Sequence, residues 1–191
     1  MIFLEEIKRS FMIIRILRKC YNLLLSFIVN IVSVPIVEVY YGGFWKYRDY
    51  LIKNKRQRSK LYDAYLERSC ASIGLKSQFE SRPMLPHGLH GIHISDGARL
   101  GSNITIFQNV TIGSNTLKDS KGSGAPTIGN NVYIGANSSI IGGIVIGDGC
   151  RIGANCCVHM NCAENQTIVM GGVRIIQHNQ VRDNRFTFLE K

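Results

Sequence analysis

The sequence predicts a mainly β protein, a parallel β-helix built from hexapeptide repeats and preceded by a short α-helical N-terminal extension. Three observations indicate this fold: an apolar residue recurs every six positions, a glycine often follows it directly, and a small or apolar residue comes four positions after it. A period of six fits neither the 3.6-residue period of an α-helix nor the two-residue alternation of a long strand. It fits a triangular coil in which each side is one hexapeptide and its leading side chain points inward, roughly 4.8 Å from its counterpart in the next coil. The leading residues are Ile94, Leu100, Ile106, Ile112, Ile128, Ile134, Ile140, Ile146, Ile152 and Val158.

The N-terminal stretch raises the question of a membrane segment. Residues 22–41 are long enough to cross a bilayer, which needs about 20 residues, but Asn30, Pro35 and Glu38 interrupt them, and a carboxylate at bilayer depth is costly. We therefore expect one or two amphipathic helices over residues 1–34, packed as a cap against the main domain or a partner subunit. A helix bound to a membrane surface is the alternative. Basic residues accompany the apolar ones at Lys8, Arg9, Arg15, Arg18 and Lys19.

The charge is concentrated in the same part of the chain. Of the net charge of +10, residues 1–72 carry +7, from 13 basic and 6 acidic side chains, and residues 73–191 carry +3. A basic extension suits an anionic membrane surface or an acidic carbohydrate, and without a DNA- or RNA-binding motif we expect no nucleic-acid partner. Residues 46–68 are expected to form a charged, solvated helix.

The six cysteines form no Cys-x-x-Cys pair and no zinc-finger spacing. Cys150 and Cys156 lie one repeat apart, in positions that suit small core residues. We expect reduced thiols in a cytoplasmic protein, with contact at the inner face of the membrane left open.

The repeat has a faint beginning and two interruptions. It starts at Ile73, Phe79 and Leu85, and the nine residues from Leu85 to Ile94 predict a three-residue bulge in the sequence PHGLHG. The sixteen residues from Ile112 to Ile128 predict that residues 114–126 leave the prism as a loop. Glycine, asparagine and aspartate at the corners are expected to take positive φ angles.

These segments divide the chain into three parts. We expect a helical extension over residues 1–70, a β-helix over residues 71–176 and a tail over residues 177–191.

The repeats, the segment FQNVTIG (107–113) followed by a loop rich in lysine and glycine, and the ending MGGVRII (170–176) are similar to a known family. They resemble the left-handed β-helix, or hexapeptide-repeat, acyltransferases, in the branch that holds serine acetyltransferases and polysaccharide O-acetyltransferases. The resemblance covers residues 73–175. It implies a left-handed coil, acetyl-CoA as the acetyl donor, and a homotrimer with active sites between subunits.

One departure bears on the acceptor. Serine acetyltransferases have a second active-site histidine in an Asp-Arg-His-Pro segment after the loop, whereas the matching stretch here, GSGAPTIG (122–129), has Ala125 in that place. The segments around PHG and GSNTLKDSKGSGAPTIG look more like those of enzymes that acetylate sugar hydroxyls. We therefore expect a sugar or polysaccharide precursor as the acceptor, with free serine as the alternative.

Acetyl transfer from a thioester to an alcohol needs a base with a pKa near neutrality, and histidine is the usual choice. His87, between Pro86 and Gly88 in the bulge, matches the family's catalytic histidine, and His90 in the same bulge is the competing candidate. His93 alternates with inward-pointing isoleucines and should face outward. A carboxylate usually orients such a base, and the candidates are Glu80 and Asp96.

The acetyl-CoA site is expected where small residues let the pantetheine arm approach the backbone. Two loop lysines are candidates for contact with the CoA phosphates. The chemistry requires no metal. Two rival interpretations are a metal hydratase of the γ-carbonic anhydrase type, which needs three convergent histidines, and a β-helix that acts only as a scaffold or binding module. The donor-site candidates are Gly113, Ser114, Lys118, Lys121, Gly135, Ala136, Gly153 and Ala154.

Overall fold

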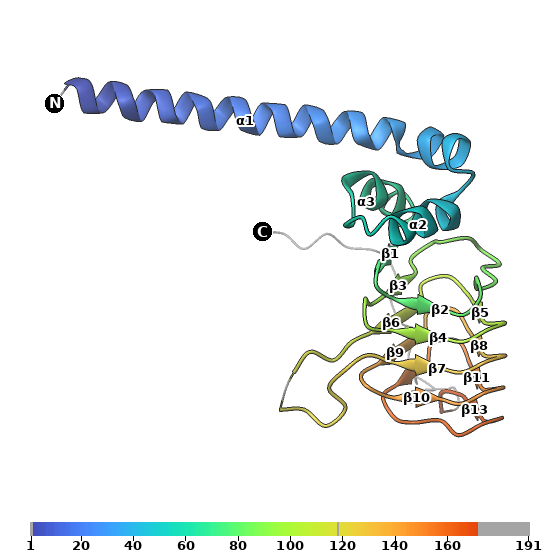
Figure 1. Cartoon of the computed structure of the whole chain (residues 1–191). Coiled ribbons are helices and arrows are strands. Elements are labelled where there is room, and N and C mark those ends of the chain that lie inside the picture. The colour runs from blue at the N-terminus through green and yellow to red at the C-terminus, as the bar shows by residue number, and fades with distance from the viewer. Residues whose placement is uncertain (1, 118, 172–191) are drawn as a thin grey trace, which may run out of the picture.

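The computed structural model describes residues 2–117 and 119–171, with side chains from Met12 onward. Helices come first and short parallel strands follow, as Figure 1 shows, so the predicted fold class is confirmed. The helices are α1 (Ile2–Pro35), the π-helical turn η1 (Ile36–Tyr40), α2 (Phe44–Lys53) and α3 (Lys60–Glu67). The strands are β1 (Ser72–Ile73), β2 (Gln78–Phe79), β3 (His93–Ile94), β4 (Arg99–Leu100), β5 (Thr105–Ile106), β6 (Thr111–Gly113), β7 (Thr127–Ile128), β8 (Tyr133–Ile134), β9 (Ser139–Ile141), β10 (Val145–Ile146), β11 (Arg151–Ile152), β12 (Cys157–Val158) and β13 (Thr167–Ile168).

The strands form three parallel sheets, one on each side of a triangular prism. Sheet A has the order β1-β3-β6-β9-β12, sheet B has β2-β4-β7-β10, and sheet C has β5-β8-β11-β13. The chain passes from sheet A to B to C and then returns to A one coil further from the helices (Figure 1). Each full coil therefore has an A–B corner, a B–C corner and a C–A corner.

The faint start of the repeat is a real first coil. β1 pairs with β3 and β2 pairs with β4, while Met84 pairs with Thr105 on the third side. Further down, Thr127 pairs with Val145 and Tyr133 pairs with Arg151, so paired residues lie 18 positions apart, which is three hexapeptides. The leading side chains stack in the interior, where each is at most 4% exposed.

The corner residues follow a different rule from the expected one. Positive φ angles occur at the third position after the leading residue, as at Asn137 (φ 61°) and Gly149 (φ 69°), and not at Asp148 or at the glycine that directly follows the leading residue. The position directly after the leading residue requires glycine for another reason, because the next coil leaves no room for a side chain. A Cβ on Gly135 would lie 2.6 Å from the backbone nitrogen of Ala154. The expectation of positive φ for every corner glycine and aspartate is therefore wrong. The asparagines with positive φ at these corners are Asn103, Asn109, Asn131, Asn137, Asn155 and Asn165.

Residues 46–68 do not form the single solvated helix that their charge suggests. Ser59 begins a second helix, because its Oγ accepts a hydrogen bond from the backbone N–H of Tyr62 (3.1 Å) and so caps the N-terminus of α3. Both helices bury aromatic side chains, and Tyr47 and Tyr62 are at most 3% exposed. The hydroxyl of Tyr62 donates to the carbonyl oxygen of Ile73 (3.1 Å), which joins α3 to the first coil.

Arg48 joins α2 to the same coil. Its guanidinium is buried, lies 4.9 Å from the centre of the Phe79 ring, and donates to the carbonyl oxygen and the Oγ of Ser77. Burial lowers the pKa of Arg48, and the nearby Tyr62 partly offsets this effect. Helices α2 and α3 thus close one end of the prism.

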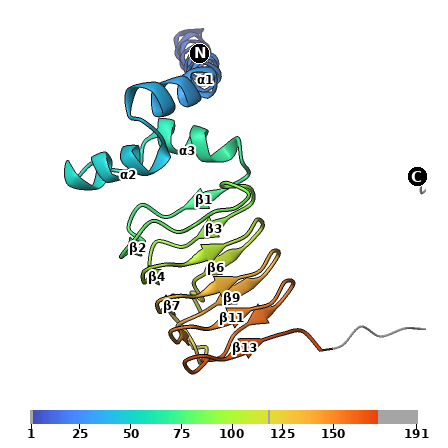
Figure 2. The same cartoon turned by 90° about the vertical axis from the view of Figure 1, so that its right-hand side faces the viewer.

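Helix α1 lies across the stacking direction of the coils. Figure 2 looks along α1, and the coils are still seen edge-on beneath it, so the two views agree on this arrangement. Only its C-terminal part meets the rest of the protein: the buried Ser33 faces α3, and Arg68 donates to the carbonyl oxygen of Asn30 (3.2 Å). Packing of α1 against the main domain is therefore confined to its C-terminal end, and packing of the rest against a partner subunit stays a prediction.

Candidate functional site

The bulge that carries two histidines occupies the first C–A corner. It consists of two consecutive turns, closed by Gly88 N–H to the carbonyl of Leu85 (3.0 Å) and Ile92 N–H to the carbonyl of Leu89 (3.1 Å). Leu85 and Leu89 pack against the core and anchor the turns from inside. The anchored turns fix the backbone from which His87 and His90 project.

His87 is exposed on the outer side of this corner. Pro86 precedes it and Gly88 (φ 65°) follows it, a sequence typical of a tight turn with proline at the second position. Its ring lies against that of Phe107, with centroids 5.7 Å apart, and Phe107 lies 5.1 Å from Tyr133 in the next coil. His87 thus stands at the top of an aromatic column, with its imidazole open to solvent and to a substrate.

His90 occupies the second turn and is also exposed. Its backbone carbonyl accepts a hydrogen bond from the N–H of Asn109 (2.9 Å) in the next coil. The same type of bond recurs in the coils below, where Asn137 N–H donates to the backbone carbonyl of Gln108 (3.1 Å) and Asn155 N–H donates to that of Ala136 (2.9 Å). The backbone of His90 therefore holds the C–A corners in register. His93, in β3, is exposed on sheet A, and its paired neighbour is Thr111.

The candidate carboxylates lie at other corners. Glu80 follows β2 at the B–C corner, where its Oε2 accepts from the Oγ of Ser102 (3.2 Å). Asp96 lies at the A–B corner, where its Oδ1 accepts from the backbone N–H of Lys76 (3.0 Å) and so joins two successive coils. Across the part of the chain that the structure describes, no hydrogen bond or ion pair joins a carboxylate to His87. The pairing of Glu80 with His87 within one chain is therefore wrong, because the two residues follow different sides of the prism.

The expected acetyl-CoA residues fall into two groups. Gly135 and Ala136 follow β8, and Gly153 and Ala154 follow β11, so both pairs lie at C–A corners in successive coils below the bulge. Their small side chains leave the outer edge of this column open. Next to it, Gln108 has a buried Oε1 that accepts no hydrogen bond from any described residue. The C–A corners thus combine an exposed histidine with the small residues of two later coils.

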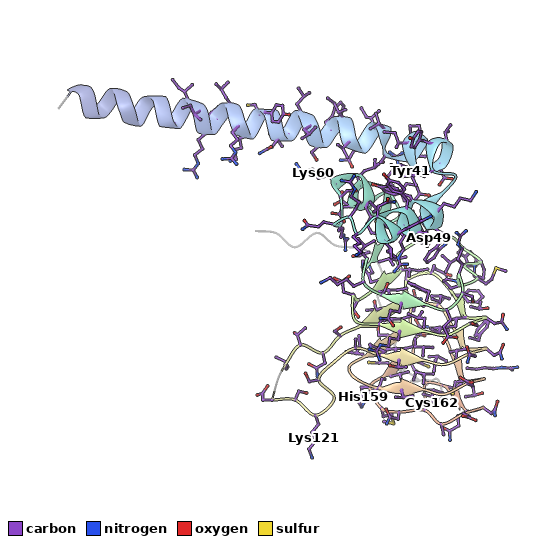
Figure 3. The ribbon with its side chains drawn as sticks, in the orientation of Figure 1. Tyr41, Asp49, Lys60, Lys121, His159 and Cys162 are labelled. Carbon is purple, nitrogen blue, oxygen red and sulfur yellow. The ribbon has the colours of Figure 1, made fainter. Side chains whose placement is uncertain are left out.

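The second group lies at the A–B corner. Gly113 ends β6, and Ser114 begins the loop over residues 114–126, whose base is closed by the antiparallel pair Asn115 and Gly124. Lys121 is exposed and projects from this loop, away from the prism (Figure 3). Lys118 lies outside the described residues. Within one chain the loop and His87 occupy different corners.

Ala125 closes the loop on its return to the prism. Its side chain is half-buried, and a Cβ placed on Gly97 would lie 2.9 Å from the Ala125 Cβ, so this position packs against the second coil. Serine acetyltransferases have a histidine at the matching position, and Ala125 supplies no imidazole here.

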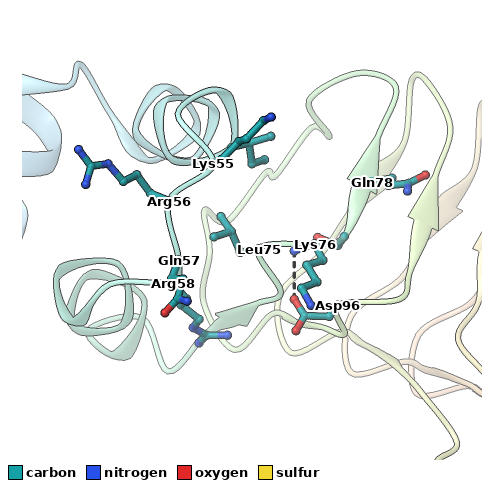
Figure 4. Close-up of a pocket in the computed structure, with 10 residues that line it drawn as sticks. Lys55, Arg56, Gln57, Arg58, Leu75, Lys76, Gln78 and Asp96 are labelled. Atoms are coloured by element: carbon teal, nitrogen blue, oxygen red, sulfur yellow. Dashed lines mark hydrogen bonds between the residues drawn. The ribbon is translucent and has the colours of Figure 1, made fainter.

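A further pocket lies away from the two bulge histidines and was missed by the sequence-based prediction. It has a volume of about 690 Å³ and lies between the α2–α3 connection and the first coil, as Figure 4 shows. Lys55, Arg56, Arg58 and Lys76 make it basic, with Asp96 at its edge. The basic run over residues 53–60 signals this pocket, although the charge pattern indicates a solvated helix equally well. The pocket contains no histidine.

Within residues 2–117 and 119–171, no three or more histidine, cysteine, aspartate or glutamate side chains come together in an arrangement suited to a metal ion. Three of the cysteines, Cys150, Cys156 and Cys162, are buried thiols. Burial, together with a contact to Cys150 at 3.2 Å, raises the pKa of Cys162 to about 11. This thiol is therefore protonated near neutral pH.

Comparison with known proteins agrees with the fold. The family model for the bacterial transferase hexapeptide (six repeats) matches residues 125–159. Serine acetyltransferase of Staphylococcus aureus is 31% identical over 149 residues, which cover 74% of this chain and 68% of that protein. Serine acetyltransferase of Bacillus pumilus is 31% identical over 104 residues, 54% of this chain and 46% of that protein.

A solved structure gives the same result. The crystal structure of Neisseria gonorrhoeae serine acetyltransferase aligns with a TM-score of 0.53 at 30% identity, covering 64% of this chain and 46% of that chain. A left-handed parallel β-helix of this kind defines a hexapeptide-repeat transferase. The chain belongs to the serine acetyltransferase family. It spans about half the length of the first relatives that it matches, between 46% and 52%.

Proposed function

We propose that this protein is an O-acetyltransferase that moves the acetyl group of acetyl-CoA to a hydroxyl of a small acceptor. The observation that carries the proposal is the position of His87, exposed at the first C–A corner on the same edge of the prism as the small residues of two later coils. The family membership supports the same reaction class, because the relatives described above are named serine acetyltransferases.

In the proposed reaction, His87 acts as the general base. A ring nitrogen of His87 takes the proton from the acceptor hydroxyl as the hydroxyl oxygen attacks the thioester carbonyl. The carbon–sulfur bond then breaks, the thiolate of CoA leaves, and the proton held by His87 returns to the thiolate. The acetyl ester and free CoA are the products, and no covalent bond to the protein is needed.

The C–A column is the proposed site for the pantetheine arm of acetyl-CoA. Gly135, Ala136, Gly153 and Ala154 leave room for the arm close to the backbone, and the unpartnered Oε1 of Gln108 supplies an acceptor for one of its amide N–H groups. Glycine at these positions is also required for coil stacking, so the small-residue edge serves both purposes.

We also propose that the active sites form between the subunits of a trimer. Support comes from the separation of His87 from the loop over residues 114–126, which occupy different corners of one prism. Packing of prisms about a threefold axis parallel to their length would place the loop of one subunit near the C–A corner of the next. Asp96 of a neighbour, which lies at the same A–B corner as the loop, would then be available to His87.

Two acceptors are candidates, for different reasons. The names of the relatives favour L-serine. Ala125, where the family has a histidine, favours a sugar hydroxyl instead, because the protein lacks the imidazole that belongs to the serine site in the family. We propose L-serine as the first acceptor to test and a sugar hydroxyl as the second.

Release of free thiol from acetyl-CoA tests both candidate acceptors. The full chain is incubated with acetyl-CoA and either L-serine or a panel of free and nucleotide-linked sugars, and thiol release is followed together with product mass. Acceptor-dependent thiol release identifies the substrate class. Absence of turnover with every acceptor, together with absence of CoA binding by calorimetry, would instead favour a scaffold or binding module.

A further inference from the structure

Helix α1 exposes a large apolar surface. Between Met12 and Ile31 eleven of its apolar side chains are 47% to 68% exposed, and only Leu25 and Val29 are half-buried, which is unusual for a soluble helix of this length. By length and composition the segment Met12–Tyr40 is apolar enough to enter a membrane. The exposed apolar side chains are Met12, Ile13, Ile14, Ile16, Leu17, Tyr21, Leu23, Leu24, Phe27, Ile28 and Ile31.

From Met12 to Ser33 the polar residues of α1 are confined to one stripe. Their spacing of three or four positions places them on a single face of the helix. At 3.6 residues per turn, the stripe covers about one third of the helix circumference and the apolar residues occupy the remaining two thirds. The members of this polar stripe are Arg15, Arg18, Lys19, Asn22, Ser26, Asn30 and Ser33.

The stripe faces the protein and the apolar residues face away from it. Ser26 and Asn30 line a pocket of about 240 Å³ together with Lys60 and Glu67 of the α3 side, and Ser33 is fully buried. On the opposite face, Leu24, Phe27 and Ile31 are 57% to 64% exposed. The side of α1 that meets α3 thus carries polar residues together with the half-buried Leu25 and Val29, while most of the apolar surface of α1 faces away from the protein.

The width and charge of this surface identify its occupant. Two helices that pair as a coiled coil need only a narrow apolar seam, whereas this face is several residues wide. Arg15, Arg18 and Lys19 lie on the polar stripe, where long basic side chains can reach lipid headgroups at the edge of the apolar face. This combination is typical of helices that lie in an anionic bilayer surface.

The orientation of α1 distinguishes lying in the surface from crossing it. One side of the helix is covered by α3 from Ser26 onward, so no complete apolar sleeve of about 20 residues is left free for lipid. The helix also lies across the stacking direction of the coils (Figures 1 and 2). A membrane in contact with the apolar face would therefore lie parallel to α1, with the prism standing away from it.

We propose that α1 binds an anionic lipid bilayer by lying in its surface, with the apolar face in the lipid and the polar stripe toward the prism. The proposal does not depend on the acceptor or on the acetyl-transfer reaction.

Vesicle flotation tests the contact with a matched pair of variants. Leu24→Asp places a carboxylate on the apolar face, and Asn22→Asp places the same charge on the exposed polar stripe half a turn away. The full chain is floated with vesicles of phosphatidylcholine alone or with 30 mol% phosphatidylglycerol (roughly the anionic content of a cytoplasmic leaflet). We expect the wild-type protein and Asn22→Asp to float with anionic vesicles, and Leu24→Asp to bind at least about tenfold more weakly.

The charge contribution has its own variant. Arg15→Gln, Arg18→Gln and Lys19→Gln together should weaken binding to anionic vesicles by roughly 100-fold, since each basic residue near the surface contributes about a factor of five. Binding of the wild-type protein should also weaken with salt, and that of the triple variant much less.

Tryptophan quenching distinguishes a helix in the surface from one that spans. In a Trp45→Phe background, Ile13→Trp and Phe27→Trp lie on the apolar face about 21 Å apart along the helix. For a helix in the surface, quenching by brominated lipids should place the Ile13→Trp and Phe27→Trp side chains at the same depth in the bilayer. The fluorescence of Asn22→Trp, on the polar stripe, should remain unquenched. Different depths for the first two would contradict the in-plane arrangement.

Two other outcomes would overturn the proposal. One is equal flotation of Leu24→Asp and Asn22→Asp. The other is a wild-type protein that stays unbound to both vesicle types at low salt and forms a larger assembly that Leu24→Asp dissociates; a second copy of the chain would then cover the apolar face.

Discussion

The imidazole of His87 lies against the ring of Phe107 in the coil below it, with the ring centroids 5.7 Å apart. Phe107 in turn contacts Tyr133, so three rings form a column along the outer face of sheet C. Histidine bases are often oriented by a carboxylate, but here the described contacts of the ring are aromatic. The position of His87 within one chain therefore depends on its two turns and on this column.

Replacement of the proposed base should abolish most turnover. We expect His87→Ala to lower kcat by about 10²- to 10⁴-fold, because the acceptor hydroxyl is a poor nucleophile until it loses its proton. Thiol release from acetyl-CoA with the best acceptor measures the effect, and His90→Ala is the control. A larger loss in His90→Ala than in His87→Ala would assign the base to the second turn instead.

Removal of the ring beneath His87 should affect the rate more than binding. We expect Phe107→Ala to lower kcat by about 5- to 50-fold, because the imidazole gains freedom to leave its reactive position. The KM for acetyl-CoA should change little. Tyr133→Ala, which removes a ring that contacts Phe107 and not His87, should have a smaller effect, and equal losses in both variants would argue against a positioning role.

A methyl group at the closest approach of two coils should destabilise the prism. In Gly135→Ala the new Cβ would lie 2.6 Å from the Ala154 nitrogen, and the obstructing atoms are backbone atoms that cannot rotate away. We expect a loss of about 2–3 kcal/mol, seen as a fall in Tm of roughly 5–10 °C. Gly171→Ala, which meets nothing within 4 Å, is the control and should unfold at the wild-type temperature.

Alkaline pH should weaken the contact between the helices and the first coil. Burial raises the pKa of Tyr62 from 10.0 to about 12, so the folded protein holds this proton more tightly than the unfolded chain does. The free energy of unfolding should therefore be unaffected by Tyr62 below about pH 10 and should fall between pH 10 and pH 12, by about 2–3 kcal/mol in total.

Urea unfolding of wild-type protein and Tyr62→Phe at several pH values measures this contribution. The variant should be about 1 kcal/mol less stable at neutral pH, because the Ile73 carbonyl loses a hydrogen bond, and it should lose less stability above pH 10. Cys162, whose pKa is also raised, contributes equally to both proteins, so their difference isolates Tyr62. If the free energy of unfolding fell equally with pH in the two proteins, the pKa of Tyr62 would not be raised by folding.

The six-residue period was sufficient to predict the prism, because each leading residue has one place in the coil. It also predicted the bulge and the loop, since both interrupt the six-residue spacing of the leading residues. The corner of each site residue follows from the number of hexapeptides that precede it. Glu80 comes after side B and His87 after side C, and a count by sides would have excluded their pairing.

The helical part was predicted less well for a physical reason. Arg48 and Tyr62 lie in a stretch so rich in charge that it suggests a solvated helix, yet both side chains are buried. Their burial depends on partners far away in the sequence, the Ser77 oxygens and the Ile73 carbonyl, which no local pattern reveals. The outward position of most of the apolar surface of α1 is similar, because amphipathicity shows that a helix has two faces and not which one meets the protein.

The pairing of Tyr133 with Arg151 and of Ser139 with Cys157 also limits how this chain can change in length. Loss of a single hexapeptide would turn every later segment by one side of the triangle, so that Ala154 would leave the edge it shares with Ala136. Loss or gain of 18 residues would restore each later segment to its own side. Natural variation in the length of the prism should therefore come in whole coils, with shorter insertions confined to the bulge and the loop.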